Sequence, residues 1–334
     1  MSIEREHLPA PPKVLGALQT GFDSITRHVS LVLFPLGLDL FIWFAPHLRI
    51  KHYIEQFIVE INALPALTSP ELKDAMQLGQ EVWLLIAERF NIFVTIRSYP
   101  VGIFSLMSSL LPMKNPVGEP VFVEFSSLGA ALLVGVLLTV VGIVLGALYF
   151  SSVVQVALHD EVRWRELLHD WPRASGQTLL LTLAWAIIFI CVAIFGGCLI
   201  SGVALFSASM GQATILLYVT LMTWLLFPLF FSAHGIFVNK ENAWRSLLRG
   251  AQLANLTFIK TGLFVLTLVL LVQGLNMLWQ ISPEDSWLML VSISGHAFIS
   301  TGALAASFVY YQDMAQWAQK MLALQKEHIE QEEQ

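Results

Sequence analysis

One long segment without a charged side chain constrains the fold more than any other feature. No Asp, Glu, Lys or Arg occurs from Ala174 to Asn239, and the same holds for 125–159, 261–283 and 286–312. Charged residues make up only 13% of the chain, whereas they are about 25% of an ordinary soluble domain. A membrane-spanning helix needs roughly 20 apolar residues, so the first segment must hold two such helices and each of the others one. The sequence therefore predicts a multi-pass membrane protein.

We expect an all-α integral membrane fold with six transmembrane helices, called spans here. Their predicted ranges are 29–47, 127–156, 176–204 and 212–238 (together 176–238), and 257–280 and 287–311 (together 257–311). The remaining segments are an N-terminal tail and helix at 1–28, connectors at 48–126, 157–175 and 239–256, and a C-terminal tail at 312–334.

The basic residues near the span ends predict the orientation. They gather in the N-terminal tail, in the connectors 157–175 and 239–256, and in the C-terminal tail, whereas the turn at 281–286 carries only Glu284 and Asp285. Because short cytoplasmic segments are enriched in Lys and Arg, we expect a cell-membrane protein with both termini in the cytoplasm.

Residues 48–126 are the only long connector on the side away from the cytoplasm, and we expect a helical extracytoplasmic insertion there. Apolar residues recur at helical spacing from Leu72 to Phe90, which predicts an amphipathic helix lying on the membrane or on the spans. The following apolar stretch from Val101 to Leu111 is too short to cross. It is re-entrant, interfacial or packed on its neighbours, and the sequence leaves these alternatives open.

The chain contains an internal repeat. Residues 161–168 (EVRWRELL) match residues 241–248 (ENAWRSLL) at five positions, each time ahead of a predicted helical hairpin. In each copy, Trp164 and Arg165 or Trp244 and Arg245 belong to a short amphipathic helix, which we expect to lie flat at the inner leaflet and lead into the next span. We call such a segment an elbow helix. A similar apolar stripe from Val14 to Ile25 predicts three parallel units, each an elbow helix plus two spans.

The run from Asn239 to Gly250, followed by Asn255 and a span, resembles the elbow segments of a group of prokaryotic multi-pass proteins. The group includes the membrane domain fused to some glycerophosphodiester phosphodiesterases. The resemblance covers about residues 120–315 and implies a membrane domain. It implies no phosphodiesterase activity, because nothing in the chain corresponds to the catalytic barrel of that enzyme.

Asp39 is the only acidic residue deep within a span, and His296 of the last span lies at a similar predicted depth. One hypothesis pairs the two side chains in a buried hydrogen bond. The other makes Asp39 a structural residue bonded to a backbone amide or a serine. On span two, Gly135, Gly142 and Gly146 share a face that favours close helix packing over a permeation path.

The sequence gives no sign of enzyme chemistry. It lacks a Gly-x-Ser-x-Gly elbow, a His-Glu-x-x-His motif, a phosphate loop and a dinucleotide glycine pattern, and we expect no cofactor and no metal site. A net charge of -6 disfavours nucleic acid. The expected partners are the lipid bilayer and other membrane proteins.

Three functions remain as hypotheses. The first is a non-catalytic scaffold or accessory component of an envelope process. The second is a small-solute or ion transporter that uses Asp39, and the third is a lipid-handling membrane enzyme. A transporter should show a polar cavity at mid-depth that reaches Asp39, whereas a scaffold should be packed there.

Overall fold

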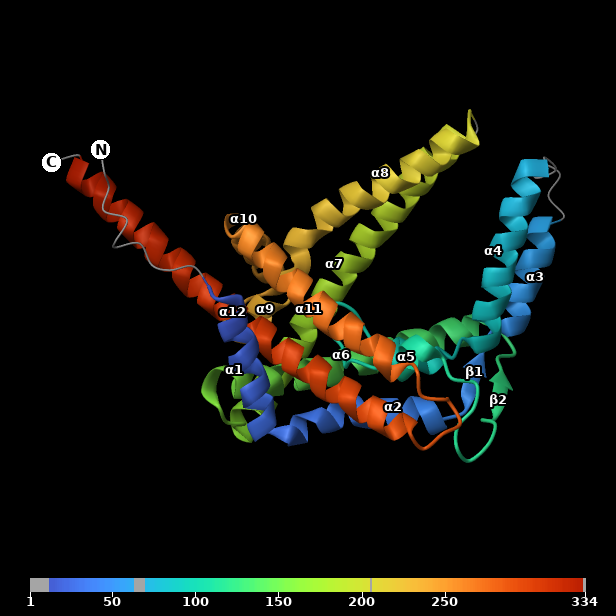
Figure 1. Ribbon diagram of the computed structural model, residues 1–334, viewed down its shortest axis with the longest axis horizontal. Coiled ribbons are helices and arrows are strands. Elements are labelled where there is room, and N and C mark those ends of the chain that lie inside the picture. Colours follow the sequence, from blue (N-terminus) through green and yellow to red (C-terminus); the bar gives the residue numbers. More distant parts are fainter. Residues whose placement is uncertain (1–11, 63–69, 205, 333–334) are drawn as a thin grey trace.

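The computed structural model describes residues 12–62, 70–204 and 206–332, and these are mostly helical (Figure 1). The α-helices are α1 Val14–Arg27, α2 Leu33–Phe44, α3 Lys51–Asn62, α4 Pro70–Arg89, α5 Met107–Leu110, α6 Leu128–His159, α7 Trp164–Ala204, α8 Ala208–Leu226, α9 His234–Val238, α10 Ala243–Leu256, α11 Phe258–Trp279 and α12 Met289–Glu332. Three 3-10 helices, η2 Val29–Val32, η4 Ile92–Ile96 and η5 Phe227–Phe231, and two strands, β1 His47–Arg49 and β2 Phe122–Glu124, complete the described chain.

Among the described residues, five helices are long and apolar enough to cross a membrane. The number rises to six if α1 and the helical segment Val29–Phe44, which meet at a bend of 92°, count as one span. This agrees with a multi-pass all-α protein. The insertion was predicted to be helical, but it also contains β-structure, because β1 and β2 pair there as a short parallel ladder.

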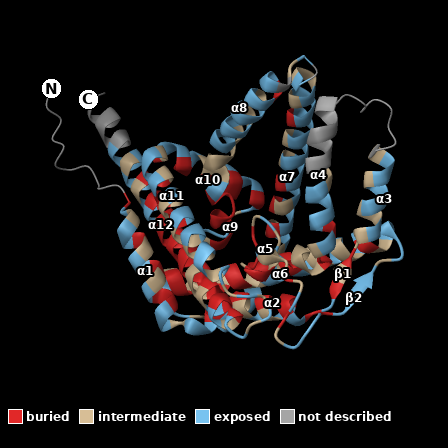
Figure 2. Ribbon diagram, turned by 45° about the vertical axis from the view of Figure 1, so that its right-hand side comes forward, coloured by how far each residue is buried: buried red, intermediate tan, exposed pale blue. Residues whose placement is uncertain are grey.

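The last span, α12, is the centre of the helical body. Of its most apolar stretch 67% is buried, against 6% for the segment Ser209–Val238, and Figure 2 shows the buried residues gathered around α2, α6 and α12. The first helix, α1, lies directly on α12. A Cβ at Gly21 would come within 2.3 Å of the Ala306 backbone nitrogen, so only a glycine permits this approach.

The elbow segments differ from one another in the structure. Helix α10 is a separate helix before α11, and α1 precedes η2 and α2 across the 92° bend. The second elbow, at 157–175, is not separate, because α7 runs without a break from Trp164 to Ala204 with Pro172 inside it. In each repeat copy the central leucine is buried, at Leu167 and Leu247, while Trp164 and Trp244 are 57% and 65% exposed.

The backbone repeats as well as the sequence. Asp160 and Lys240 each precede the glutamate that begins a repeat copy, and both adopt a left-handed conformation, with φ of 58° and 53°. Non-glycine residues enter this region rarely. The same rare backbone conformation therefore precedes both repeat copies, directly at the end of α6 in the first and two residues after the end of α9 in the second.

Span four is broken rather than straight. Helix α8 ends at Leu226, and η5, with Pro228 at its start, and α9 continue the segment to Val238. Polar side chains satisfy the backbone at this break, since the Ser246 hydroxyl donates to the Ser232 carbonyl and accepts from the Ile236 N–H. Trp185 Nε1 also donates to the Ser232 hydroxyl. The break thus becomes the surface on which α10 packs.

Two helical hairpins extend away from the body, one made of α3 and α4 and the other of α7 and α8 (Figure 1). The amphipathic helix expected between Leu72 and Phe90 is α4, and the side chains described on it include Val82, Trp83 and Leu85, all at least half exposed. The side chains of residues 62–78 lie outside the described part.

Contacts between connectors lie at two ends of the helical body. At one end, Arg27 binds Asp160 at 2.9 Å and Lys240 binds Asp170 at 2.7 Å. At the other end, Glu284 accepts a hydrogen bond from the Met113 N–H at 2.8 Å. We call the first end the basic end and the second the Glu284 end.

Candidate functional site

Asp39 lies in the middle of α2 and is fully buried. Its Oδ1 accepts hydrogen bonds from the Ser105 hydroxyl at 2.5 Å and the Met107 N–H at 3.0 Å, and its Oδ2 accepts from the Leu106 N–H at 3.1 Å. These amides belong to the start of α5, whose first N–H groups have no partner within the helix. The carboxylate therefore caps a short helix from a neighbouring element.

The segment held by Asp39 is a re-entrant loop, defined here as residues 92–113. It starts at the Glu284 end, where the Asn91 side chain accepts from the Leu48 N–H, and it returns there, where Met113 bonds to Glu284. Between these points it reaches the middle of α6, with Gly102 against Gly146. At 1.5 Å per residue, Gly146 is about 27 Å along α6 from Leu128. Of the alternatives for the stretch from Val101 to Leu111, the structure shows that the stretch is packed on its neighbours.

The glycine face predicted on span two is the surface that receives this loop. A Cβ at Gly142 would lie 2.0 Å from the Ile96 carbonyl oxygen, and one at Gly146 would lie 2.8 Å from the Cα of Gly102. Gly135 has looser contact, with a Cβ 3.9 Å from Ile92. The small residues thus allow backbone to pack on backbone.

The hypothesis that Asp39 and His296 form a hydrogen-bonded pair does not agree with the structure. Asp39 uses both oxygens on the re-entrant loop, and His296 Nδ1 lies 2.8 Å from Oδ1 of Asn276 on the adjacent α11. Similar depth on two helices does not fix which side chains face each other, and the loop takes the position beside Asp39. The alternative, a structural aspartate bonded to a serine and to backbone amides, describes the observed contacts.

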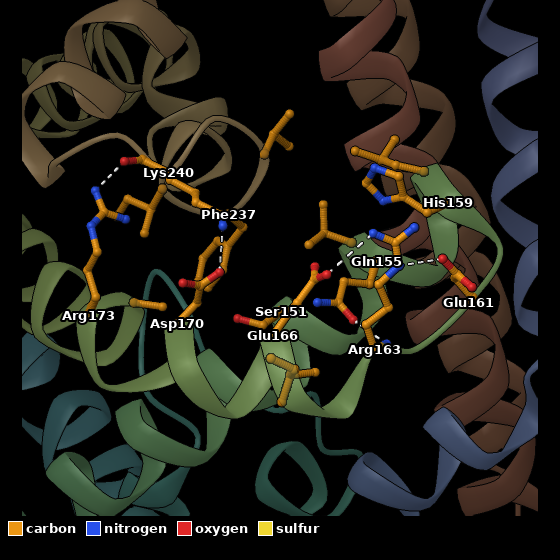
Figure 3. Close-up of a pocket in the computed structure, with 16 residues that line it drawn as sticks. Ser151, Gln155, His159, Glu161, Arg163, Glu166, Asp170, Arg173, Phe237 and Lys240 are labelled. Atoms are coloured by element: carbon orange, nitrogen blue, oxygen red, sulfur yellow. Dashed lines mark hydrogen bonds and ion pairs between the residues drawn. The ribbon is translucent and has the colours of Figure 1, made fainter.

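A second polar site lies at the basic end. An open cavity of about 300 Å³ is lined by the end of α6, the first turns of α7 and the α9–α10 connector (Figure 3). Its charged and titratable lining residues are His159, Glu161, Arg163, Glu166, Asp170, Arg173 and Lys240, and Val154, Leu158, Leu167, Ile236 and Phe237 form much of its apolar wall.

The charges of this cavity form two groups. In one, Arg163 binds Glu161 at 2.5 Å and Glu166 at 3.5 Å. The hydrogen bond and the negative charge of Glu161 raise the pKa of Arg163, so the guanidinium stays charged. In the other group, Lys240 binds Asp170, and the Arg173 guanidinium donates to the Lys240 carbonyl. The left-handed turn at Lys240 is thus part of the cavity wall.

Sequence reasoning placed only part of this site. Arg165 and Arg245 are exposed and do not line the cavity, whereas Arg163 and Arg173 do. The repeat located the connectors, but only the structure shows that 163, 173 and 240 converge. Within the described residues, no group of three His, Cys, Asp or Glu side chains has the geometry to hold a metal.

These features define a class, namely a multi-pass helical membrane protein with a re-entrant loop and a charged pocket at one end. Comparison of the chain with protein-family models, with curated proteins and with solved structures finds no match.

Proposed function

We propose that this protein is a non-catalytic scaffold or accessory component of an envelope process, located in the cell membrane with both termini in the cytoplasm. The proposal rests on the hydrogen bonds that the Asp39 side chain makes. Its carboxylate, buried in the middle of α2, is committed to three hydrogen bonds that hold the re-entrant loop. A transport site would need that group free to bind and release a solute or a proton.

The extended hairpins supply the contact surfaces for such a role. On α3, Phe57 and Val59 are 59% and 68% exposed, and on α4 Trp83 is 54% exposed. Exposed apolar surface of this kind marks contact with lipid or with another protein.

The proposed architecture is three parallel units, each made of an elbow helix and two spans. The left-handed turns at Asp160 and Lys240 support the relation between the second and third units. The resemblance to membrane domains fused to phosphodiesterases is compatible with it and adds no catalysis.

Site-specific photo-crosslinking in intact cells tests the scaffold role. A photoreactive amino acid in place of Trp83 should give discrete protein adducts, because this side chain lies on the exposed face of α4. The same amino acid in place of Val117, which is 77% exposed on the loop between α5 and β2, is the matched control. Adducts with lipid alone at position 83, or the same protein adducts from both positions, would contradict the proposal.

Cysteine labelling tests the proposed orientation. The native Cys191 and Cys198 are both exposed and are first replaced by serine. In that background, Asp285→Cys should react with a membrane-impermeant maleimide added to intact cells, and Arg165→Cys should react only after permeabilisation. Reaction of both positions in intact cells would rule out opposite sides for the two connectors.

A further inference from the structure

The pocket at the basic end has a feature that the scaffold role does not use, which is a separation of charge along its wall. Arg163 binds two carboxylates, Glu161 and Glu166, so these three side chains together carry a net charge of −1. Lys240 binds Asp170 and the Arg173 guanidinium donates to the Lys240 carbonyl, so these three side chains together carry a net charge of +1. In Figure 3 the two groups lie on opposite sides of the cavity.

Unused hydrogen-bonding capacity is present in both groups. A guanidinium has five N–H donors, and among the described residues the hydrogen bond that Arg173 makes is to one main-chain carbonyl. In the other group, two carboxylates share the single Arg163, and the contact of Glu166 with it is a long one at 3.5 Å. A ligand with an anionic end and a hydrogen-bond-donating cationic end would therefore find partners at both ends.

We propose that this pocket binds the headgroup of a zwitterionic aminophospholipid of the phosphoethanolamine type, from the membrane leaflet at the basic end. The phosphate would lie at Arg173 and Lys240, and the ammonium group at Glu161 and Glu166. An anionic lipid fits less well, because the three cations of the wall are balanced by three carboxylates. A quaternary ammonium headgroup also fits less well, since it has no N–H to donate to the carboxylates.

The surroundings of the pocket favour a lipid over a soluble ligand. Trp164 and Leu168, from the same first turns of α7, are 57% and 53% exposed, and exposed Trp and Leu beside Arg are typical of a helix at the membrane interface. A second cavity, of about 390 Å³, lies next to the Arg173–Lys240 contact and is lined by Leu180, Leu181, Ala184, Trp244 and Leu247, with Gln177 and Ala243 joining its walls through a hydrogen bond. This mainly apolar surface gives room for an acyl chain near the headgroup.

The test is native mass spectrometry of the full-length protein from nanodiscs that contain equal amounts of phosphatidylethanolamine, phosphatidylcholine and phosphatidylglycerol. The wild-type protein should retain phosphatidylethanolamine over each other lipid by about tenfold, the ratio expected when one or two charge-assisted hydrogen bonds distinguish the ligands. Glu166→Gln should remove the preference over phosphatidylcholine. Arg173→Gln should lower retention of all three lipids, because each of them carries the phosphate.

Arg165→Gln is the matched control for Arg173→Gln, because Arg165 lies on the same helix, is exposed and does not line the pocket. It should leave the lipid ratios unchanged. Equal retention of all three lipids, preference for phosphatidylglycerol, or the same loss in Arg165→Gln would overturn the proposal. Displacement of the bound lipid by an equal concentration of soluble glycerophosphoethanolamine would also overturn it, since the ligand would then come from solution.

Discussion

Replacing Gly142 by alanine should destabilise the protein by about 3 kcal/mol, at the upper end of the usual cost of overpacking. The added methyl group would lie 2.0 Å from the Ile96 carbonyl oxygen and 2.7 Å from the carbon of that carbonyl. These are backbone atoms of the re-entrant loop, so no side-chain rotation can relieve the clash. The loop would have to leave α6, and Asp39 would lose the geometry of its contacts.

Gly129→Ala provides a matched control on the same helix. A Cβ at Gly129 meets nothing within 4 Å, so the identical chemical change should be close to neutral. Thermal unfolding in nanodiscs, followed by tryptophan fluorescence, measures both variants. If Gly142→Ala unfolds at the same temperature as Gly129→Ala, the loop does not pack against α6 as described.

Replacing Asp39 by alanine should cost about 4 kcal/mol, because each buried donor left without an acceptor costs roughly 1 to 3 kcal/mol. Three donors lose their partner, namely the Ser105 hydroxyl and the amides of Leu106 and Met107. Asp39→Asn should be intermediate. Its remaining carbonyl oxygen can still accept from Ser105 and Met107, while its amide group would face the Leu106 N–H.

The same series separates the structural role of Asp39 from transport. For the control Asp23→Ala, which removes an exposed carboxylate from α1, stability should stay near that of the wild type. A structural aspartate predicts the order wild type, asparagine, alanine for unfolding temperature. A transport residue predicts instead that Asp39→Asn keeps wild-type stability and changes solute flux or a growth phenotype, and that result would favour the transporter hypothesis over the scaffold.

The spans were predictable from the sequence because most of them lie in long segments without a charged side chain. The predicted span 257–280 differs by one residue at each end from α11, Phe258–Trp279. The predicted span 176–204 ends at the same residue as α7, Ala204. The glycine face on span two was also informative, since small residues at helical spacing let another backbone approach closely. Its partner was not predictable, because the backbone that fills it comes from Ile96 and Gly102, outside any span.

The hydrogen-bond partners of Asp39 could not be predicted from the sequence, for a related reason. Depth along a helix follows from residue number, but the direction a side chain faces depends on which elements pack there. Ser105 lies in a short apolar stretch with no periodic pattern, so nothing marked it as a partner. The second elbow was expected to be a short helix within 157–175, whereas α7 continues through Pro172 into the span without a break.

The packing of α1 on α12 bears on how the protein is made. Synthesis proceeds from the N-terminus, so Gly21 emerges long before Ala306, the backbone it must meet. Glu284, which joins the return of the re-entrant loop to the turn between α11 and α12, is also late in the chain. The early helices are therefore inserted into the bilayer before their final neighbours have been synthesised. A chain that stops before α12 would leave α1 without the helix on which it packs, and it would then be exposed to quality-control proteolysis.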